Sequence, residues 1–199
     1  MTNTNNKSNI FNKNNSKTDL RVIKTKRAIN NALVDLLQKK PINKITVAEL
    51  SEKAEINKGT FYLHYVDIYD LYQKALQEHL IKIVDRMDFL DLFFTDPDMF
   101  SRTLVMQSIN KSIFTNDPFL SENNISFNQS AHFYFCNALA SKVLASNKIQ
   151  ATRENKIKLK FIFSGSGSIM RYSSYEDSEI IINLISNTIK NIFPDFHKI

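Results

Sequence analysis

Apolar residues recur every three or four positions along most of this chain, which is the spacing of one face of an α-helix. The clearest apolar stripes fall in residues 20–37, 47–54, 67–87 and 180–193. Breaks such as Asp96-Pro97 and Asp117-Pro118 separate further helices, which we expect at about 98–115, 127–146, 153–173 and 177–192. Since the 199 residues include only three glycines and four prolines, the pattern predicts an all-α protein.

Two short predicted helices joined by a tight turn lie within residues 45–71, ITVAELSEKAEINKGTFYLHYVDIYDL. Thr46 and Glu49 have the spacing of a capping box at the start of the first helix. Asn57 is a suitable N-cap for the second. The expected core side chains of this segment are Leu50, Ile56, Phe61 and Tyr65.

The second helix of this pair is expected to expose a polar and aromatic set that suits a nucleic-acid groove. Its members are Lys58, Thr60, Tyr62, Leu63 and His64. Gly59 is small enough to let the backbone approach a partner closely. Such a helix-turn-helix places its second helix in the major groove of DNA. An ordinary helical hairpin with an exposed aromatic residue is the alternative interpretation.

The positive charge of the chain is concentrated near its start. Residues 1–65 hold 12 Lys+Arg against 5 Asp+Glu, a net charge of +7, whereas residues 88–199 hold 11 of each. This segregation is typical of a DNA-binding domain joined to a neutral regulatory domain. A solvated charged face is the alternative explanation.

These patterns predict four consecutive parts. Residues 1–16 contain seven asparagines and are expected to form a disordered basic arm, because they cannot bury enough apolar surface to offset the entropy of ordering. The helix-turn-helix domain is expected at 17–66, a linking helix at 67–87 and a regulatory and dimerisation domain at 88–199. Arg21, Lys24 and Arg27 would lie over a phosphate backbone.

From about Arg21 to Leu80 the chain resembles the N-terminal DNA-binding domain of the TetR family of bacterial transcriptional regulators. The resemblance rests on TKRAINNAL, ITVAEL and NKGTFYLHYVDIYDL, and it covers 60 of the 199 residues. It implies that Gly59 permits close approach to DNA and that Phe61 and Tyr65 anchor the recognition helix. It also implies that DNA bases or phosphates are faced by Thr46, Lys58, Thr60, Tyr62, Leu63 and His64. Among these, Tyr62 and His64 fit phosphate contacts, and Lys58 and Thr60 fit base edges.

Two positions depart from the family pattern. Glu55 stands where the family usually has a turn glycine, and a glutamate adopts a left-handed conformation only at some energetic cost. Ile68 stands where the family usually has a lysine that contacts a phosphate. We therefore expect an altered turn at Glu55 and weaker DNA binding near Ile68, or compensation by the basic arm.

The last two predicted helices carry a signal for oligomerisation. Residues 180–193, IIINLISNTIKNIF, are apolar around most of the helix circumference, so more than one side must be covered. The stretch FIFSGSGS at 161–168 adds small residues that allow close helix packing, or else marks a kink. The family resemblance also implies a homodimer formed through these helices. A two-fold dimer would bind a palindromic operator.

The resemblance further implies a pocket in residues 88–199 for an unknown small-molecule effector. We expect the regulator to be a repressor. This part is rich in aromatic side chains, which suit an apolar pocket or, for most of them, the core. They are Phe93, Phe94, Phe100, Phe114, Phe119, Phe127, Phe133, Tyr134, Phe135 and Phe163.

No catalytic or cofactor motif accompanies these features. His132 and Cys136 have i, i+4 spacing on a predicted helix, but two ligands do not make a metal site, so neither a metal nor another cofactor is expected. Without a nucleophile elbow or a phosphate-binding loop, we expect no enzyme activity. A single cysteine excludes an intrachain disulfide, and residues 1–16 lack the apolar run of a signal peptide, so a cytoplasmic location without membrane insertion is expected.

The sequence thus predicts a sequence-specific DNA-binding transcriptional regulator. Two alternatives stay open, namely a TetR-like co-regulator acting through protein partners and a metal-sensing regulator that contacts DNA in the same way.

Overall fold

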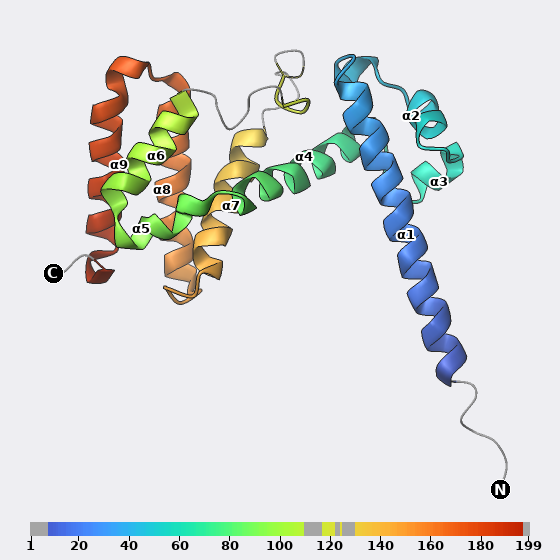
Figure 1. Cartoon of the computed structure of the whole chain (residues 1–199), viewed down its shortest axis with the longest axis horizontal. Helices are drawn as coiled ribbons and strands as arrows, with labels where there is room; N and C mark the ends of the chain where they lie inside the picture. The colour runs from blue at the N-terminus through green and yellow to red at the C-terminus, as the bar shows by residue number, and fades with distance from the viewer. Residues whose placement is uncertain (1–7, 110–116, 122–123, 125–129, 197–199) are drawn as a thin grey trace, which may run out of the picture. The chain divides into compact units, whose positions relative to one another are not determined.

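A computed structural model describes residues 8–109, 117–121, 124 and 130–196, and every regular element in these ranges is a helix (Figure 1). The predicted all-α fold is confirmed. The chain divides into two compact units, Met1–Ala75 and Leu76–Ile199. The boundary falls inside one helix, α4 (Ile68–Asp85), whose first part belongs to the first unit and whose remainder belongs to the second.

The first unit consists of α1 (Ser8–Leu37), the 3₁₀ turn η1 (Ile42–Lys44), α2 (Val47–Lys53), α3 (Lys58–Tyr62) and the beginning of α4. Its core contains the predicted Leu50, Phe61 and Tyr65, whereas Ile56 is only half-buried. Each helix adds its apolar stripe to this core. The fully buried members from the flanking helices are Ile29, Leu33, Leu71 and Tyr72.

Helix α1 begins earlier than the sequence pattern predicts. Residues 8–16 continue this helix, although a disordered arm is expected over 1–16. The segment from Ser8 to Leu37 contains neither glycine nor proline, and adding residues to an existing helix costs little compared with nucleating one. Residues 1–7 lie outside the described ranges.

The second unit contains η2 (Asp88–Asp91), α5 (Leu92–Thr95), α6 (Pro97–Ile109), α7 (Ala131–Ala145), α8 (Arg153–Tyr172), η4 (Tyr175–Asp177), α9 (Ser178–Ile192) and η5 (Pro194–Phe196). The long helices match the predicted ones, and the break at Asp96-Pro97 is confirmed. The two short elements η2 and α5 were not expected. The parts of the predicted helices at 110–115 and 127–129 lie outside the described residues.

Aromatic side chains fill the centre of the second unit. The Phe93 ring lies 4.8 Å from that of Phe94, 5.3 Å from Phe100, 5.6 Å from Phe163 and 5.9 Å from Phe193, measured between ring centroids. These rings come from α5, α6, α8 and the residue that follows α9, so the short helix α5 packs against the longer ones. Phe119 is also buried, whereas Phe114 and Phe127 lie outside the described residues.

Helix α9 packs against α6 and α8. Two ion pairs hold α6 to α9: Arg102 binds both carboxylate oxygens of Glu179, at 2.7 and 3.1 Å, and Lys190 binds Asp98 at 2.7 Å. Helix α8 runs without a break through residues 161–168, so the small residues there do not end the helix.

Candidate nucleic-acid interface

The turn between α2 and α3 keeps a left-handed residue where the family pattern has glycine. Glu55 has a φ of 55°. The N–H of Glu55 donates to the Glu52 carbonyl at 3.1 Å, and the N–H of Ile56 donates to the Ser51 carbonyl at 3.0 Å. These two bonds form a Schellman motif, the usual helix ending with glycine in the left-handed position. The expected alteration of the turn is therefore wrong: Glu55 adopts the left-handed conformation, and the backbone hydrogen bonds hold the regular turn in spite of its cost.

Helix α3 is fixed at its start by Asn57. The Asn57 Oδ1 atom accepts from the Thr60 N–H at 2.7 Å and from the Thr60 hydroxyl at 3.0 Å. The predicted cap is confirmed. The half-buried Thr60 side chain is thereby held in place, and its oxygen keeps a lone pair free to accept from a base edge.

The residues predicted to contact DNA on and beside α3 are exposed or half-buried. Tyr62 is 57% exposed and Leu63 80% exposed, while Lys58 and Gly59 are exposed and His64 is half-buried. Beneath them the buried Phe61 ring lies 5.3 Å from Tyr62 in an edge-on arrangement and 5.6 Å from Tyr65. The aromatic anchors therefore hold the exposed side chains from below.

Thr46 lies at the start of α2 and caps it. Its hydroxyl oxygen accepts from the Glu49 N–H at 3.2 Å. The Glu49 carboxylate does not complete the expected capping box, because it binds the Lys40 ammonium at 2.5 Å. The exposed Thr46 hydroxyl keeps its hydrogen available for a phosphate oxygen.

The cations of the first unit whose side chains the structure describes fall into two groups. Lys40, Lys53 and Lys74 form ion pairs with Glu49, Asp35 and Asp70. Within the described part of the chain, no ion pair engages Arg21, Lys24, Lys26, Arg27, Lys39, Lys44 or Lys58. The second group therefore supplies the positive charge that is available to a polyanion.

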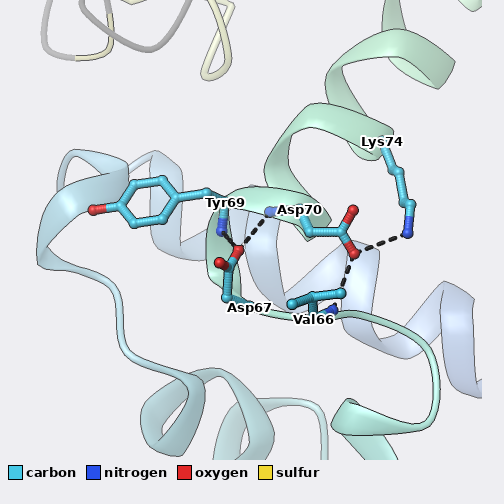
Figure 2. A network of polar contacts seen from close by, with 5 residues as sticks. All are labelled: Val66, Asp67, Tyr69, Asp70 and Lys74. Atoms are coloured by element: carbon cyan, nitrogen blue, oxygen red, sulfur yellow. Dashed lines mark hydrogen bonds and ion pairs between the residues drawn. The ribbon is translucent and has the colours of Figure 1, made fainter.

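The start of α4 is capped by two carboxylates (Figure 2). Asp67 Oδ1 accepts from the N–H groups of Tyr69 at 2.9 Å and Asp70 at 2.8 Å. Asp70 accepts from the Val66 N–H at 3.0 Å and from Lys74 at 2.8 Å. The bond from Lys74, and then the one from Val66, lower the pKa of the Asp70 carboxyl below its ordinary value.

Ile68 and Tyr69 divide the first turn of α4 between core and surface. Ile68 is only 8% exposed, so it contributes to the core at the position where the family pattern has a phosphate-binding lysine. Tyr69 is 43% exposed, and its ring points away from the carboxylate cap (Figure 2). The apolar stripe Ile68, Leu71 and Tyr72 in the sequence already places Tyr69 outside the core.

The His132 and Cys136 pair on α7 is part of the packing of the second unit. Their side chains lie 3.3 Å apart, between Nδ1 and Sγ, and the thiol donates to the Phe163 carbonyl at 3.3 Å. Burial raises the pKa of the Cys136 thiol to about 11, and burial followed by the nearby Arg171 charge lowers the pKa of His132. His79 instead pairs with Asp117. The described residues bring no third His, Cys, Asp or Glu to this pair as a metal ligand.

A groove of about 350 Å³ lies between the second half of α4 and α7. Two exposed apolar side chains, Phe133 and Ile81, line it together with the ion pair between Lys142 and Asp85, whose atoms are 3.2 Å apart. The remaining lining residues are Gln77, Val84, Tyr134, Asn137, Ala138, Ser141 and Ala145. The groove is open to solvent on one side, where Phe133 and Ile81 are exposed.

No protein-family model matches the chain. It is 33% identical over 70 residues to the uncharacterized HTH-type transcriptional regulator YxbF of Bacillus subtilis (strain 168), a stretch that makes up 35% of this chain. A segment of the chain is thus similar to a helix-turn-helix regulator. The match spans 18% of the relative's own length.

Two solved structures of regulators are similar over much of the chain. RolR without ligand gives a TM-score of 0.47 at 14% identity, covering 83% of this chain and 95% of that one. The dihydroxyacetone kinase operon activator DhaS gives 0.41 at 16% identity, covering 86% and 96%. Neither similarity is close enough to assign a function to this chain.

Within the part of the chain that the structure describes, no helix combines the length and the apolar character needed to cross a membrane.

Proposed function

We propose that this chain is a sequence-specific DNA-binding transcriptional regulator of the TetR type. It binds a palindromic operator in the cytoplasm as a homodimer, and it acts as a repressor that a small-molecule effector releases. The observation that carries the proposal is the exposed set on α3, which is held by a capped helix and by buried aromatic anchors.

Charge on the same unit supports a nucleic-acid partner. Lys58 is exposed and unpaired at the start of α3, and six further cations of the described first unit are also outside ion pairs. Phosphate contacts from such side chains orient a protein on the duplex, while contacts to base edges select the sequence. In the proposed complex Tyr62 and His64 contact phosphates, and Lys58 and Thr60 contact bases.

Binding to DNA from upstream of the chain's own gene tests this function. The logarithm of the binding constant should fall steeply with the logarithm of salt concentration, because neutralised phosphates release counterions. Lys58→Ala should weaken operator binding by about tenfold or more, since a specific base contact contributes about 1–3 kcal/mol.

Lys74→Ala is the matched control. It removes the same charge, but the Lys74 ammonium is bound to Asp70 and lies 5.5 Å from the centre of the Tyr65 ring, so DNA binding should change little. If the logarithm of the DNA-binding constant hardly changes with the logarithm of salt concentration, and binding of a protein partner is retained, the co-regulator alternative would be favoured.

The proposed effector site is the groove between α4 and α7. Its apolar walls and its Lys142–Asp85 pair suit a small, partly apolar molecule with a polar group. An effector that binds the DNA-incompetent state more tightly than the competent one releases the operator by shifting the population between them. Ser141→Trp should fill the exposed side of the groove and abolish this response while leaving operator binding intact.

A further inference from the structure

Two large apolar side chains are exposed where α3 ends. Leu63 is 80% exposed and Val66, three residues later, is 79% exposed, which makes them the most exposed large aliphatic side chains of the described residues. A single exposed apolar residue is common on protein surfaces and needs no explanation. Here two of them lie at the end of the helix that is proposed to enter a DNA groove, so the group that covers them would belong to that groove.

Helical geometry directs Leu63 away from the core of the first unit. The Leu63 N–H donates to the Gly59 carbonyl at 3.2 Å, so the last turn of α3 includes this residue. Successive helix residues are about 100° apart, and Leu63 is two residues from each of the buried Phe61 and Tyr65. Two residues correspond to about 200°, so Leu63 lies nearly opposite the two aromatic anchors.

Gly59 leaves space beside Leu63. It precedes Leu63 by about one helical turn, so the two residues lie on nearly the same side of α3. A Cβ atom added at Gly59 would lie 3.2 Å from Asn57 Oδ1, tighter than ordinary contact, so the helix start fits glycine there. Without a side chain at this position, a base pair can approach the α3 backbone, and a group on its edge can then contact the Leu63 side chain.

Charge favours DNA as the partner of this surface. From Lys58 to His64 the chain carries no acidic side chain. Lys58 is exposed and forms no ion pair within the described residues, and six further cations of the first unit share this property. An apolar side chain on a unit with so many free cations suits a polyanion that also offers an apolar group.

The major groove of DNA offers such a group. Of the four bases, only thymine presents a methyl group there, beside its hydrogen-bond acceptor. The Leu63 side chain has no polar atom, so it cannot read donors and acceptors, whereas it can remove a methyl group from water. Deoxyribose is the other apolar part of DNA, but it lies along the backbone rather than on the floor of the groove.

We propose that Leu63 selects thymine in the operator by burying its methyl group, at the base pair that faces the end of α3 in each half-site. This inference rests on the DNA-binding function proposed above and adds a base identity and the residue that selects it. Val66 adds apolar surface after α3, where its N–H bond to Asp70 at 3.0 Å fixes its backbone.

Replacing thymine by uracil tests the contact, because uracil lacks only the methyl group and pairs with adenine in the same way. DNA from upstream of the chain's own gene is amplified with either dTTP or dUTP, and binding of the full chain to both fragments is measured at one salt concentration. The wild-type chain should bind the uracil fragment about fourfold more weakly for each half-site, as expected for one buried methyl group. Leu63→Ala should bind the thymine fragment more weakly and show no further loss with uracil.

Two further variants are controls. Leu63→Met keeps an apolar side chain of similar volume, so it should retain most of the preference for thymine. Ile23→Ala removes an exposed apolar side chain from α1 and should leave the ratio of the two affinities unchanged. Because Leu63 and Ile23 are both exposed, all of these variants should stay folded by circular dichroism.

The outcomes separate this inference from the function on which it rests. If the wild-type chain binds neither fragment more tightly than unrelated DNA, the DNA-binding function and the thymine contact are overturned together. If it binds both fragments equally well, or if Leu63→Ala keeps the wild-type preference for thymine, only the contact is overturned, and Leu63 meets deoxyribose or a protein instead. A preference for thymine that Leu63→Ala loses and Ile23→Ala keeps supports the contact.

Discussion

Replacing Glu55 by glycine should stabilise the protein, because this residue holds the left-handed position of the turn between α2 and α3 with a φ of 55°. Its side chain is exposed and forms no ion pair among the described residues, so the substitution removes no attractive contact. The hydrogen bonds of the turn come from the backbone and remain available to glycine.

The size of the effect follows from two opposing contributions. A left-handed conformation costs an L-residue with a Cβ about 1–2 kcal/mol, and glycine removes this cost. The larger conformational freedom of glycine in the unfolded chain takes back about 0.5–1 kcal/mol. The net gain in the free energy of unfolding should be about 0.5–1 kcal/mol, or roughly 2–8 °C in the Tm of a unit of this size.

Glu55→Ala is the matched control, because it removes the same charge and side chain but keeps the Cβ atom. Urea unfolding followed by circular dichroism, with a second transition resolved if the units unfold separately, measures both variants. Only Glu55→Gly should gain stability. If Glu55→Ala stabilises the protein as much as Glu55→Gly does, the removed charge is responsible and the argument from backbone strain is wrong.

Three further substitutions test other parts of the structure. Ile68→Lys should lower the free energy of unfolding by about 1–3 kcal/mol, because Ile68 is buried; an unchanged urea midpoint would show that the position tolerates the family lysine. Asp70→Asn should destabilise near neutral pH by about 0.5–1 kcal/mol through loss of the Lys74 pair and the charged cap. The pKa of the Asp70 carboxyl is lowered in the folded protein, so its stabilising contribution is present above the ordinary pKa of 3.8 and is lost as the pH falls through the folded pKa. The free energies of unfolding of Asp70→Asn and of the unsubstituted protein should therefore converge at acid pH, in unfolding curves measured from pH 6 to 2. Gly167→Ala should cost about 1–3 kcal/mol by thermal unfolding because its Cβ would contact His132, and His132→Ala in the same chain should restore part of this loss if that contact is the cause.

The sequence predicts those features whose cause is local. The caps at Thr46 and Asn57 and the buried Phe61 and Tyr65 all follow from neighbouring residues and helical spacing. The helical class follows for the same reason, since apolar stripes at a period of 3.6 leave few alternatives.

Features that depend on distant residues were not predictable in this way. The Glu49 carboxylate satisfies the capping-box pattern, yet it binds Lys40, which only the folded unit brings near it. The four-residue helix α5 is too short to show a period, and its position depends on Phe93 packing against α6 and α8. The groove between α4 and α7 likewise arises from tertiary packing, although its lining residues are ordinary helix positions.

The carboxylate cap of α4 also has a consequence for the proposed contact with DNA. The free N–H groups and the positive dipole end at a helix N-terminus normally make a binding site for phosphate. Here Asp67 and Asp70 already occupy the N–H groups of Tyr69, Asp70 and Val66, and they bring negative charge to the same place. A DNA phosphate would have to displace an anion that belongs to the protein. In the proposed complex, a phosphate at this helix end would therefore meet two carboxylates of the protein, so the cap disfavours such a contact.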